Sequence, residues 1–464
     1  MLLVTGLASQ RRSRAGEGGN RRAGHGAPSP RCKVVVIGAG FGGLEAALRL
    51  ARQRNVDLTV IDSHNHHLFQ PLLYQVATAA LSPADIASPV RGIIPASNRT
   101  HVLMATVTGV DTRARRVLCD GHAVPYDELI IATGSKPSYF GHASWAEAAP
   151  GLKTLDDALA LRHSILTAFE QASVAGSAAD QARLLTFVLI GGGPTGVEMA
   201  GSIAELARDM LAHDYDMATG HARILLIEAG PRVLEAFAPD LSDDAAAALA
   251  GLGVEIRTHT SVTGIEAGLV HLHNETIAAG TVIWTAGTEA TPVAGWLGVT
   301  PGHGGRVAVG ADLRVSGHPG VSVIGDAALA SGADGKPLPG LAPVAKQQGR
   351  YVARAILRRL RGRRALAPFA YRDYGTLATI GRNKAVAEFG PVHLHGLPAW
   401  LMWAVAHIFF LIGFRNRVMV SAQWAFAYMT EERAGRLIIE RAGPRTEPRT
   451  SRTPQPVAEA GHAD

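Results

Sequence analysis

Short runs of apolar, β-branched residues alternate along the chain with segments that carry apolar residues at helical spacing. The first run, Val34 to Ile37, leads into a glycine-rich turn and then a helical pattern, and residues 184–206 repeat that order. A strand that is apolar throughout is typical of a parallel sheet covered on both faces. The pattern therefore predicts an α/β fold in which two strand–turn–helix units each begin a parallel sheet.

The first turn carries glycines at the spacing that a dinucleotide-binding turn needs. Gly38 permits the tight turn, Gly40 lets the backbone approach a pyrophosphate, and Gly43 allows the helix to pack close to the strand. The N-terminus of that helix offers unpaired N–H groups to the anion. A second strand ends in Asp62, 24 residues after Gly38, where a carboxylate can accept hydrogen bonds from both ribose hydroxyls. A dinucleotide site is thus favoured over a purely structural glycine turn.

A second turn repeats this arrangement with Gly191, Gly193 and Gly196, and the strand after it ends in Glu228. A carboxylate at this place binds a free 2′-hydroxyl and repels a 2′-phosphate. The second site is therefore expected to prefer NADH. Arg232, four residues further on, keeps NADPH open as an alternative.

Each turn is followed, much later in the chain, by a strand that ends in a small glycine-containing loop. The first loop contains Thr133 and Gly134, and the second contains Gly287. The separations from Gly38 to Gly191 and from Gly134 to Gly287 are both 153 residues. Equal spacing at two landmarks indicates that the halves are repeats of one architecture. The predicted fold has two Rossmann-like dinucleotide-binding domains.

The net charge of the 464-residue chain is +6, and it is distributed unevenly. Residues 1–31 carry +5 and predict a disordered leader without an export signal, while residues 32–349 carry −9 and residues 350–417 carry +10. The body is acidic, and the leader lacks the aromatic residues on which bases stack. No nucleic-acid partner is therefore predicted, and a nucleic-acid-associated redox sensor is only a weaker alternative.

Cys32 and Cys119 are the cysteines of the chain, 87 positions apart. They cannot supply a C-x-x-C dithiol, an iron–sulfur cluster or a four-cysteine zinc site. The cluster of His64, His66 and His67 lacks a nearby cysteine or carboxylate set. No metal site is predicted, and these histidines are interpreted as a loop beside the first nucleotide.

The two turns, the loop at Gly134 and the sequence VSVIGDAA at residues 321–328 together resemble the flavoproteins with two dinucleotide-binding domains. The resemblance implies that FAD fills the first site and NAD(P)H the second. It also implies that Asp326, preceded by Gly325, hydrogen-bonds the ribityl chain of FAD. Members of this superfamily that use redox cysteines, the disulfide reductases and the sulfide:quinone reductases, are disfavoured by the cysteine positions.

Residues 64–91 closely resemble the corresponding segment of the type II NADH dehydrogenases, which are single-subunit NADH:quinone oxidoreductases. The likeness continues at residues 341–356, 383–390 and 400–428, so it covers most of the chain. The family resemblance implies a monotopic flavoenzyme that reduces a membrane quinone.

Two motifs of that family have counterparts here. An Ala-Gln-x-Ala-x-Gln motif lines the family's quinone site; Gln347 matches the second glutamine, Pro343 stands where the first is common, and Gln348 is an alternative donor. Glu198 matches a family glutamate near the nicotinamide and flavin. The alternative is that its carboxylate has no role in the site and is only stabilised by the helix dipole in the first turn of the helix.

The candidate residues fall into catalytic, FAD-binding and NADH-binding groups. They are, for catalysis, Glu198, Gln347 and Gln348; for FAD, Gly38, Gly40, Phe41, Gly43, Asp62, Thr133, Gly134, Gly325 and Asp326; and for NADH, Gly191, Gly193, Gly196, Glu228 and Gly287.

Residues 397–414 form the longest apolar run and contain one ionisable residue, His407. Trp400, Trp403 and a following apolar segment favour helices that lie in the membrane interface. A single membrane span and a buried contact in a homodimer are the alternatives. The arginine-rich residues 350–366 predict a basic amphipathic helix, with packing against the first domain as the alternative.

These features predict a peripheral membrane flavoenzyme at the cytoplasmic face of the cell membrane. It would transfer hydride from NADH to FAD and then two electrons to a quinone from the lipid bilayer, without proton pumping; the alternative is a soluble NAD(P)H-dependent ferredoxin- or rubredoxin-type reductase. The expected parts are a leader at 1–31, an FAD domain at 32–150 and 291–370, an NADH domain at 151–290, a membrane-associating region at 371–435 and a disordered tail at 436–464.

Overall fold

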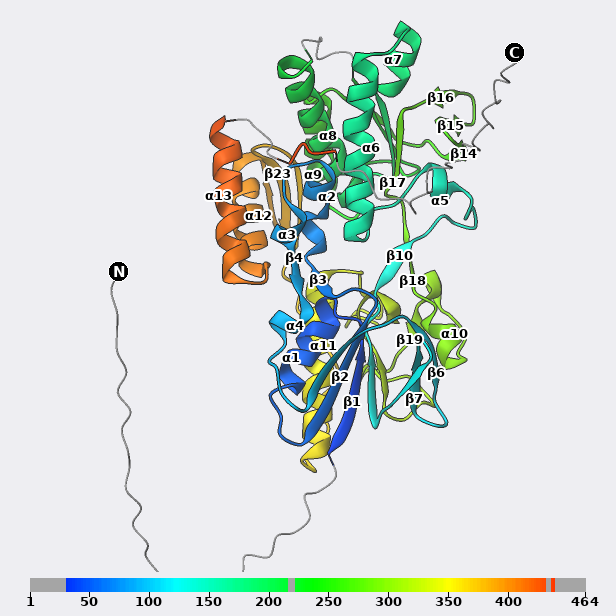
Figure 1. Cartoon of the computed structure of the whole chain (residues 1–464), viewed down its shortest axis with the longest axis vertical. Coiled ribbons are helices and arrows are strands. Elements are labelled where there is room, and N and C mark those ends of the chain that lie inside the picture. Colours follow the sequence, from blue (N-terminus) through cyan, green and yellow to red (C-terminus); the bar gives the residue numbers. More distant parts are fainter. Residues whose placement is uncertain (1–30, 216–221, 431–434, 439–464) are drawn as a thin grey trace, which may run out of the picture.

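The structure is a computed structural model that describes residues 31–215, 222–430 and 435–438. The predicted disordered leader and tail lie almost wholly outside these residues. Figure 1 shows an α/β unit at the bottom, a second α/β unit above it, and helices α12 and α13 on the flank of the upper unit.

The lower unit is built on a parallel sheet that gathers strands from distant parts of the chain. In spatial order they are β20 (Val321–Val323), β9 (Glu128–Ile131), β1 (Cys32–Ile37), β2 (Val56–Asp62) and β5 (Thr100–Met104). All of their pairings are parallel. Strand β20 follows the whole second unit in sequence, so the first sheet is completed only when the chain returns.

Alternate side chains of β1 enter different cores, as the period of a strand requires. Val34 and Val36 pack with α1 (Phe41–Leu50) and α11 (Ala342–Leu360). Val35 and Ile37 pack with an antiparallel sheet on the other face. The strands of that sheet are β6 (Val107–Asp111), β7 (Arg116–Cys119) and β8 (His122–Pro125).

The upper unit repeats this plan. Its parallel sheet contains, in spatial order, β13 (Val254–Arg257), β12 (Arg223–Ile227), β11 (Thr186–Ile190) and β17 (Thr281–Trp284). One face is covered by helices α6 (Leu155–Ser173), α8 (Pro194–His213) and α9 (Pro239–Gly251). The other is covered by the antiparallel strands β14 (Val262–Glu266), β15 (Leu269–Leu272) and β16 (Thr276–Ala278). The repeat that the 153-residue spacing predicted is present in the structure.

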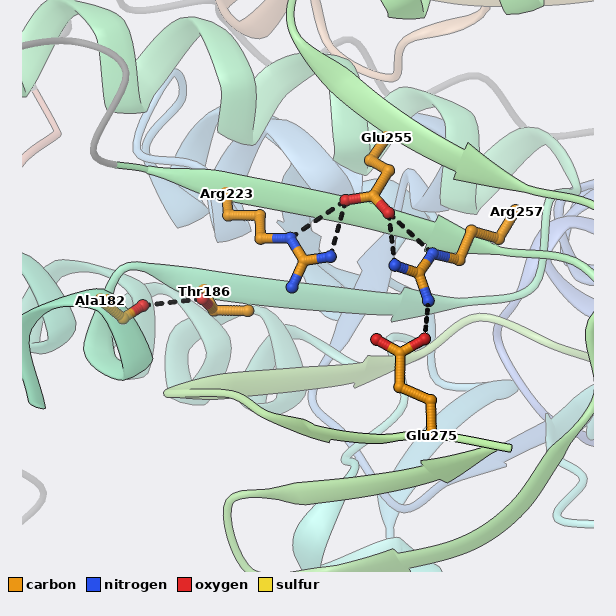
Figure 2. A network of polar contacts seen from close by, with 6 residues as sticks. All are labelled: Ala182, Thr186, Arg223, Glu255, Arg257 and Glu275. Carbon is orange, nitrogen blue, oxygen red and sulfur yellow. Dashed lines mark hydrogen bonds and ion pairs between the residues drawn. The ribbon is translucent and has the colours of Figure 1, made fainter. Parts of the chain in front are cut away.

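Ion pairs tie the outer strands of the upper sheet together. Figure 2 shows Glu255 between the guanidinium groups of Arg223 and Arg257, at 2.8 and 2.5 Å, and Arg257 reaching Glu275 at 2.5 Å. Glu275 lies between β15 and β16, so the network bridges the parallel and antiparallel sheets. Thr186 at the start of β11 donates to the carbonyl of Ala182 at 2.7 Å.

The chain crosses between the two units through an antiparallel pair of short strands, β10 (Ser135–Pro137) and β18 (Thr288–Ala290). Figure 1 shows this pair between the lower and upper sheets. Each strand directly follows one of the predicted glycine loops, at Gly134 and Gly287. The two repeats are therefore joined through equivalent points.

The C-terminal part adds an antiparallel sheet and two helices to the upper unit. They are β22 (Thr376–Gly381), β23 (Lys384–Phe389), β24 (Val392–His395), α12 (Gly396–Phe410) and α13 (Phe414–Thr430). The apolar run 397–414 is broken by the turn at 411–413. Among the described residues, no helix is both long enough and apolar enough to cross a membrane.

The arginine-rich residues belong to helix α11, which packs against the first domain. Arg350 pairs with Glu45 at 3.2 Å, and Arg359 pairs with Glu128. Figure 1 shows α11 running down the lower unit, so its C-terminal end lies away from α12 and α13. The packing alternative is what the structure shows, because these arginines neutralise carboxylates of the first domain.

The remaining short elements connect these layers. They are β3 (His66–Leu68), η1 (Gln70–Leu72), α2 (Leu73–Ala77), α3 (Pro83–Ile86), β4 (Ala87–Pro89), α4 (Val90–Ile93), α5 (Trp145–Ala148), α7 (Ala178–Leu184), α10 (Val293–Leu297), η3 (His303–Gly305), β19 (Val307–Ala308), η4 (Gly325–Ala327) and β21 (Ala328–Leu329).

Candidate functional site

The first glycine-rich turn has the backbone geometry that its sequence predicts. Gly38 has φ +95°, and a Cβ there would overlap the carbonyl oxygen of Ala132. A Cβ on Gly43 would overlap the carbonyl oxygen of Gly38. Gly40, in contrast, faces open space, with no atom within 4 Å of a Cβ placed on it. The turn is thus closed on the protein side and open on the side where a phosphate can approach.

Asp62 at the end of β2 holds this turn from the side. Its carboxylate accepts hydrogen bonds from the backbone N–H of Ala39 at 2.6 Å and of His64 at 2.8 Å. His67 is buried against the same turn, with its Nδ1 2.8 Å from the carbonyl oxygen of Ala39. Phe41, the first residue of α1, packs edge-on against His67, with ring centroids 5.3 Å apart. His66 and His67 thus lie in the short strand β3, which pairs with β4, rather than in the predicted loop, and His67 lies beside the turn.

The late GD sequence reaches the same place from the far end of the chain. Asp326 accepts a hydrogen bond from Ser135 at 2.8 Å, and Ser135 in turn accepts one from the ammonium group of Lys153 at 3.2 Å. Thr133 and Thr291 share a hydrogen bond of 2.6 Å between their hydroxyl groups. Polar groups from four segments of the chain thus converge beside the first turn.

A single cavity of about 1840 Å³ joins these groups. It is lined by the first turn, Asp62, Thr133, Gly134 and Asp326, and it extends past Glu198 to α12. Ordinary small-molecule pockets measure about 300–1,000 Å³. The space and the donors therefore fit an extended dinucleotide such as FAD with room for further reactants at its ends.

The second turn closes in the same way. Gly191 has φ +111°, and a Cβ on it would lie 2.6 Å from the backbone nitrogen of Ala286. Gly193 faces open space, as Gly40 does in the first turn. A Cβ on Gly196 would overlap the carbonyl oxygen of Gly191, so helix α8 packs as closely as α1 does.

Glu228 is the counterpart of Asp62. Its two oxygens accept the backbone N–H groups of Gly192 at 2.5 Å and Gly230 at 2.6 Å. The guanidinium of Arg232 donates to the carbonyl oxygens of Glu235 and Phe237. Arg232 is thus turned to the backbone, which favours a free ribose hydroxyl over a 2′-phosphate at this site.

Gly287 lies in the loop that follows β17 and has φ +71°. A Cβ on it would lie 2.5 Å from Cζ of Phe140. Phe140 also has positive φ, and 67% of its area is exposed. The sequence analysis missed this aromatic cover, because nothing in the local pattern around Phe140 indicates where its ring packs.

Glu198 lies on the first part of α8 and lines the cavity between the two turns. Burial raises the pKa of its carboxyl group to about 8, although a hydrogen bond from the backbone of Thr379 works against that rise. At neutral pH this side chain is therefore mainly a neutral acid that can hold a proton inside the site.

The two glutamines predicted at the quinone end have other partners. The amide of Gln347 donates to the carbonyl oxygen of Arg372 at 2.8 Å and accepts from its N–H at 3.0 Å. The carbonyl oxygen of Gln348, a buried side chain, accepts from the backbone N–H of Gly325 at 2.6 Å. Gln347 borders the cavity but is used to hold the loop at Arg372.

Lys346 and His407 are residues at this end of the cavity to which the sequence analysis assigned no role. Both line the cavity. His407 packs edge-on against Phe69 and over Trp403, with ring centroids 6.1 and 4.4 Å apart. Burial lowers the pKa of His407 to about 4, so its ring is neutral. The position of Lys346 directly before Gln347, inside the glutamine motif, was the available signal for this residue.

Comparison with known proteins identifies the class of this fold and site. Residues 32–349 match the family model described as pyridine nucleotide-disulphide oxidoreductase. The structure of NDH2 from Plasmodium falciparum in complex with NADH superposes with a TM-score of 0.81 at 22% identity, covering 88% of this chain and all of that one. The class is thus that of oxidoreductases with two nucleotide-binding domains.

The C-terminal part narrows the class further. Residues 374–431 match the NDH2 C-terminal domain. Type II NADH:quinone oxidoreductase Ndh of Mycobacterium tuberculosis is 41% identical over 89% of this chain and 91% of its own length. A type II NADH:quinone oxidoreductase of Staphylococcus haemolyticus is 30% identical over 77% of this chain and 89% of its own. The chain belongs to the type II NADH:quinone oxidoreductases.

Proposed function

We propose that the protein oxidises NADH through a bound FAD and passes two electrons to a quinone, without pumping protons. FAD supplies the chemistry, because its flavin ring accepts hydride from NADH and releases electrons to a second substrate. The observation that carries the proposal is the single cavity that runs from the first turn, past Glu198, to the apolar helix α12. It provides adjoining places for a cofactor and two different reactants.

Each part of the chain has a distinct role in this proposal. Residues 32–150 and 291–370 hold FAD through the first turn, Asp62 and Asp326, and residues 151–290 hold NADH through the second turn and Glu228. Side chains from residues 371–410 line the cavity and contribute its apolar end. Glu198, a neutral buried acid between the two turns, holds a proton beside the reacting groups.

The quinone comes from a lipid bilayer that the surface of α12 and α13 contacts. Exposed apolar side chains gather on these helices, among them Val405 (70% exposed), Phe409 (66%) and Phe414 (83%). Exposed apolar side chains that gather on adjoining helices in this way are typical of an interaction surface. We place it in the lipid interface at the cytoplasmic face, where NADH is available, so that the helices lie on the bilayer.

Rapid mixing tests the reaction directly. In the absence of oxygen, NADH should bleach the flavin absorbance of the purified holoenzyme, and a short-chain ubiquinone or menaquinone analogue should restore it. Reduction by NADH without reoxidation by any quinone would contradict the second half of the proposal. Rapid reoxidation by a ferredoxin or rubredoxin instead would support the soluble-reductase alternative.

Flotation with lipid vesicles tests the membrane surface. The double variant Phe409→Ser/Phe414→Ser should lose binding to vesicles while keeping its flavin, and Val174→Ser, at a side chain that is 82% exposed elsewhere, should bind as the parent does. Unchanged flotation of the double variant would exclude this surface. Sedimentation of both proteins shows whether the same surface is instead buried in a homodimer.

A further inference from the structure

A cationic side chain, that of Lys346, lies at the apolar end of the cavity. Lys346 lies on α11, inside the motif where Pro343 replaces the first glutamine, and it lines the cavity together with Phe409 and Phe410 of α12. Phe409 is 66% exposed and Phe410 is 41% exposed, so this end lies directly beneath the apolar surface of α12. A reactant that enters the cavity from the side of α12 would therefore pass Lys346.

Within the described part of the chain, Lys346 has no hydrogen bond or ion pair. Its ammonium nitrogen lies 5.0 Å from the ring centroid of Phe410, a cation–π contact. The nearby carboxylate of Glu45 is already paired with Arg49 at 2.9 Å and with Arg350 at 3.2 Å. The guanidinium of Arg417, also nearby, donates to the carbonyl oxygen of Leu411 at 2.8 Å.

Burial and these neighbouring cations lower the pKa of Lys346, and Glu45 raises it. The half-buried ammonium group thus has no hydrogen-bond acceptor among the described residues and is available to one that enters the cavity. The two glutamines that follow Lys346 already have hydrogen-bond partners. Gln347 is bound to the backbone of Arg372, and Gln348 to that of Gly325.

We infer that Lys346, rather than Gln347, donates the hydrogen bond that orients the carbonyl oxygen of the quinone. The inference rests on the proposed function and assigns a residue to its second substrate. The ring of an arriving quinone would contact the ring of Phe410. Its carbonyl oxygen would accept a hydrogen bond from the ammonium group of Lys346. Because the charge also favours electron density on that oxygen, Lys346 is expected to affect binding and turnover with quinone, but not with NADH.

Quinone binding without turnover gives the first readout. Oxidised holoenzyme without NADH is titrated with a short-chain ubiquinone, and quenching of flavin fluorescence reports occupancy. Lys346→Met should weaken binding about ten- to a hundredfold, the range for losing a hydrogen bond from a charged donor. Lys346→Arg should restore much of the affinity, and Lys384→Met, which removes an exposed lysine of β23 outside the cavity lining, should change nothing.

Kinetics supply the second readout. For Lys346→Met the KM for quinone should rise by a similar factor, while the rate of flavin reduction by NADH and the flavin content per chain stay at parental values. Unchanged quinone affinity and KM in Lys346→Met would overturn the inference and leave the proposed function standing. If the parent protein itself binds no quinone, both the inference about Lys346 and the proposed function fail. Equal losses of flavin reduction and of quinone affinity in Lys346→Met would show that Lys346 has a merely structural role, and would also refute the inference.

Discussion

The two glycine-rich turns have nearly the same backbone geometry, but the elements that surround them differ. Gly38 and Gly191 both have positive φ, and both turns are clamped by a carboxylate at the end of the next strand. Asp62 and Glu228 each accept two backbone N–H groups, at 2.5 to 2.8 Å. The local sequence therefore determines the turn, whichever nucleotide it serves.

The covering elements distinguish the two sites. Helix α1 is covered by α11, where a Cβ on Gly349 would lie 2.9 Å from the carbonyl carbon of Gly42. Helix α8 is covered by the C-terminal strand β22, where a Cβ on Gly201 would lie 2.9 Å from the carbonyl carbon of Ile380. The first site is enclosed by a late helix and by β20 of its own sheet. This difference suits a cofactor that stays bound in the first site and a substrate that exchanges in the second.

The largest expected effect comes from separating α11 from α1. Gly349→Val should reduce the free energy of unfolding by about 3 kcal/mol, because its side chain must displace the backbone of α1. The flavin content should fall with it, since α11 also carries Gln348, which holds Gly325. Flavin absorbance per chain and chemical denaturation measure the two effects.

Gly201→Val is the matched control, because its Cβ also meets a backbone carbonyl, with the oxygen at 2.4 Å compared with 2.1 Å for Gly349. It should destabilise the contact between α8 and β22 by a similar amount but leave the flavin bound. Equal flavin loss in both variants would refute the distinction between the two coverings.

The paired carboxylates provide the next comparison. Glu228→Ala removes the acceptor at the second turn, so the KM for NADH should rise about ten- to a hundredfold, the range for losing a charged hydrogen bond, with flavin retained. Asp62→Ala should instead lower flavin content while the remaining holoenzyme keeps its KM for NADH. Steady-state kinetics on samples normalised for flavin separate the two, and exchanged phenotypes would reverse the assignment of the sites.

The buried carboxyl group of Glu198 should make the stability of the protein depend on pH. Burial raises the pKa of its carboxyl from 4.5 to about 8, so the folded state binds this proton more tightly than the unfolded chain does. The resulting stability is present below about pH 4.5 and is lost as the pH rises through about 8. Relative to Glu198→Gln, the parent should become less stable between pH 5 and 9, as measured by denaturation, and any alkaline limb of quinone reduction near pH 8 should flatten in the variant.

The smallest effect is expected at the outer edge of the second sheet. Glu255 is 39% exposed and bridges Arg223 and Arg257, as Figure 2 shows. Exposed ion pairs contribute about 0–1 kcal/mol. Glu255→Gln should therefore lower the free energy of unfolding by at most about 1 kcal/mol and leave both nucleotide sites unchanged. A KM for NADH that moved as far as in Glu228→Ala would show that this network belongs to the site.

Much of the fold and of both turns could be predicted from the sequence, because these features depend on local backbone geometry. Glycines with positive φ, apolar strands and an acidic residue at the end of a strand act over a few positions, and their 153-residue repeat is visible in the chain. The resemblance to the type II NADH dehydrogenases likewise agreed with the family comparisons.

The partners of individual polar side chains could not be predicted in this way. Arginines that predicted a basic amphipathic helix pair with Glu45 and Glu128 of the first domain. Gln347 binds the backbone of Arg372 rather than facing the cavity as a free donor, and Lys346 is the donor left without an acceptor. Sequence alone determined where the chain turns and which strands are buried, because those choices are local. Only the tertiary structure decided which donors were already satisfied, because hydrogen-bond partners are set by segments that approach from far away in the chain.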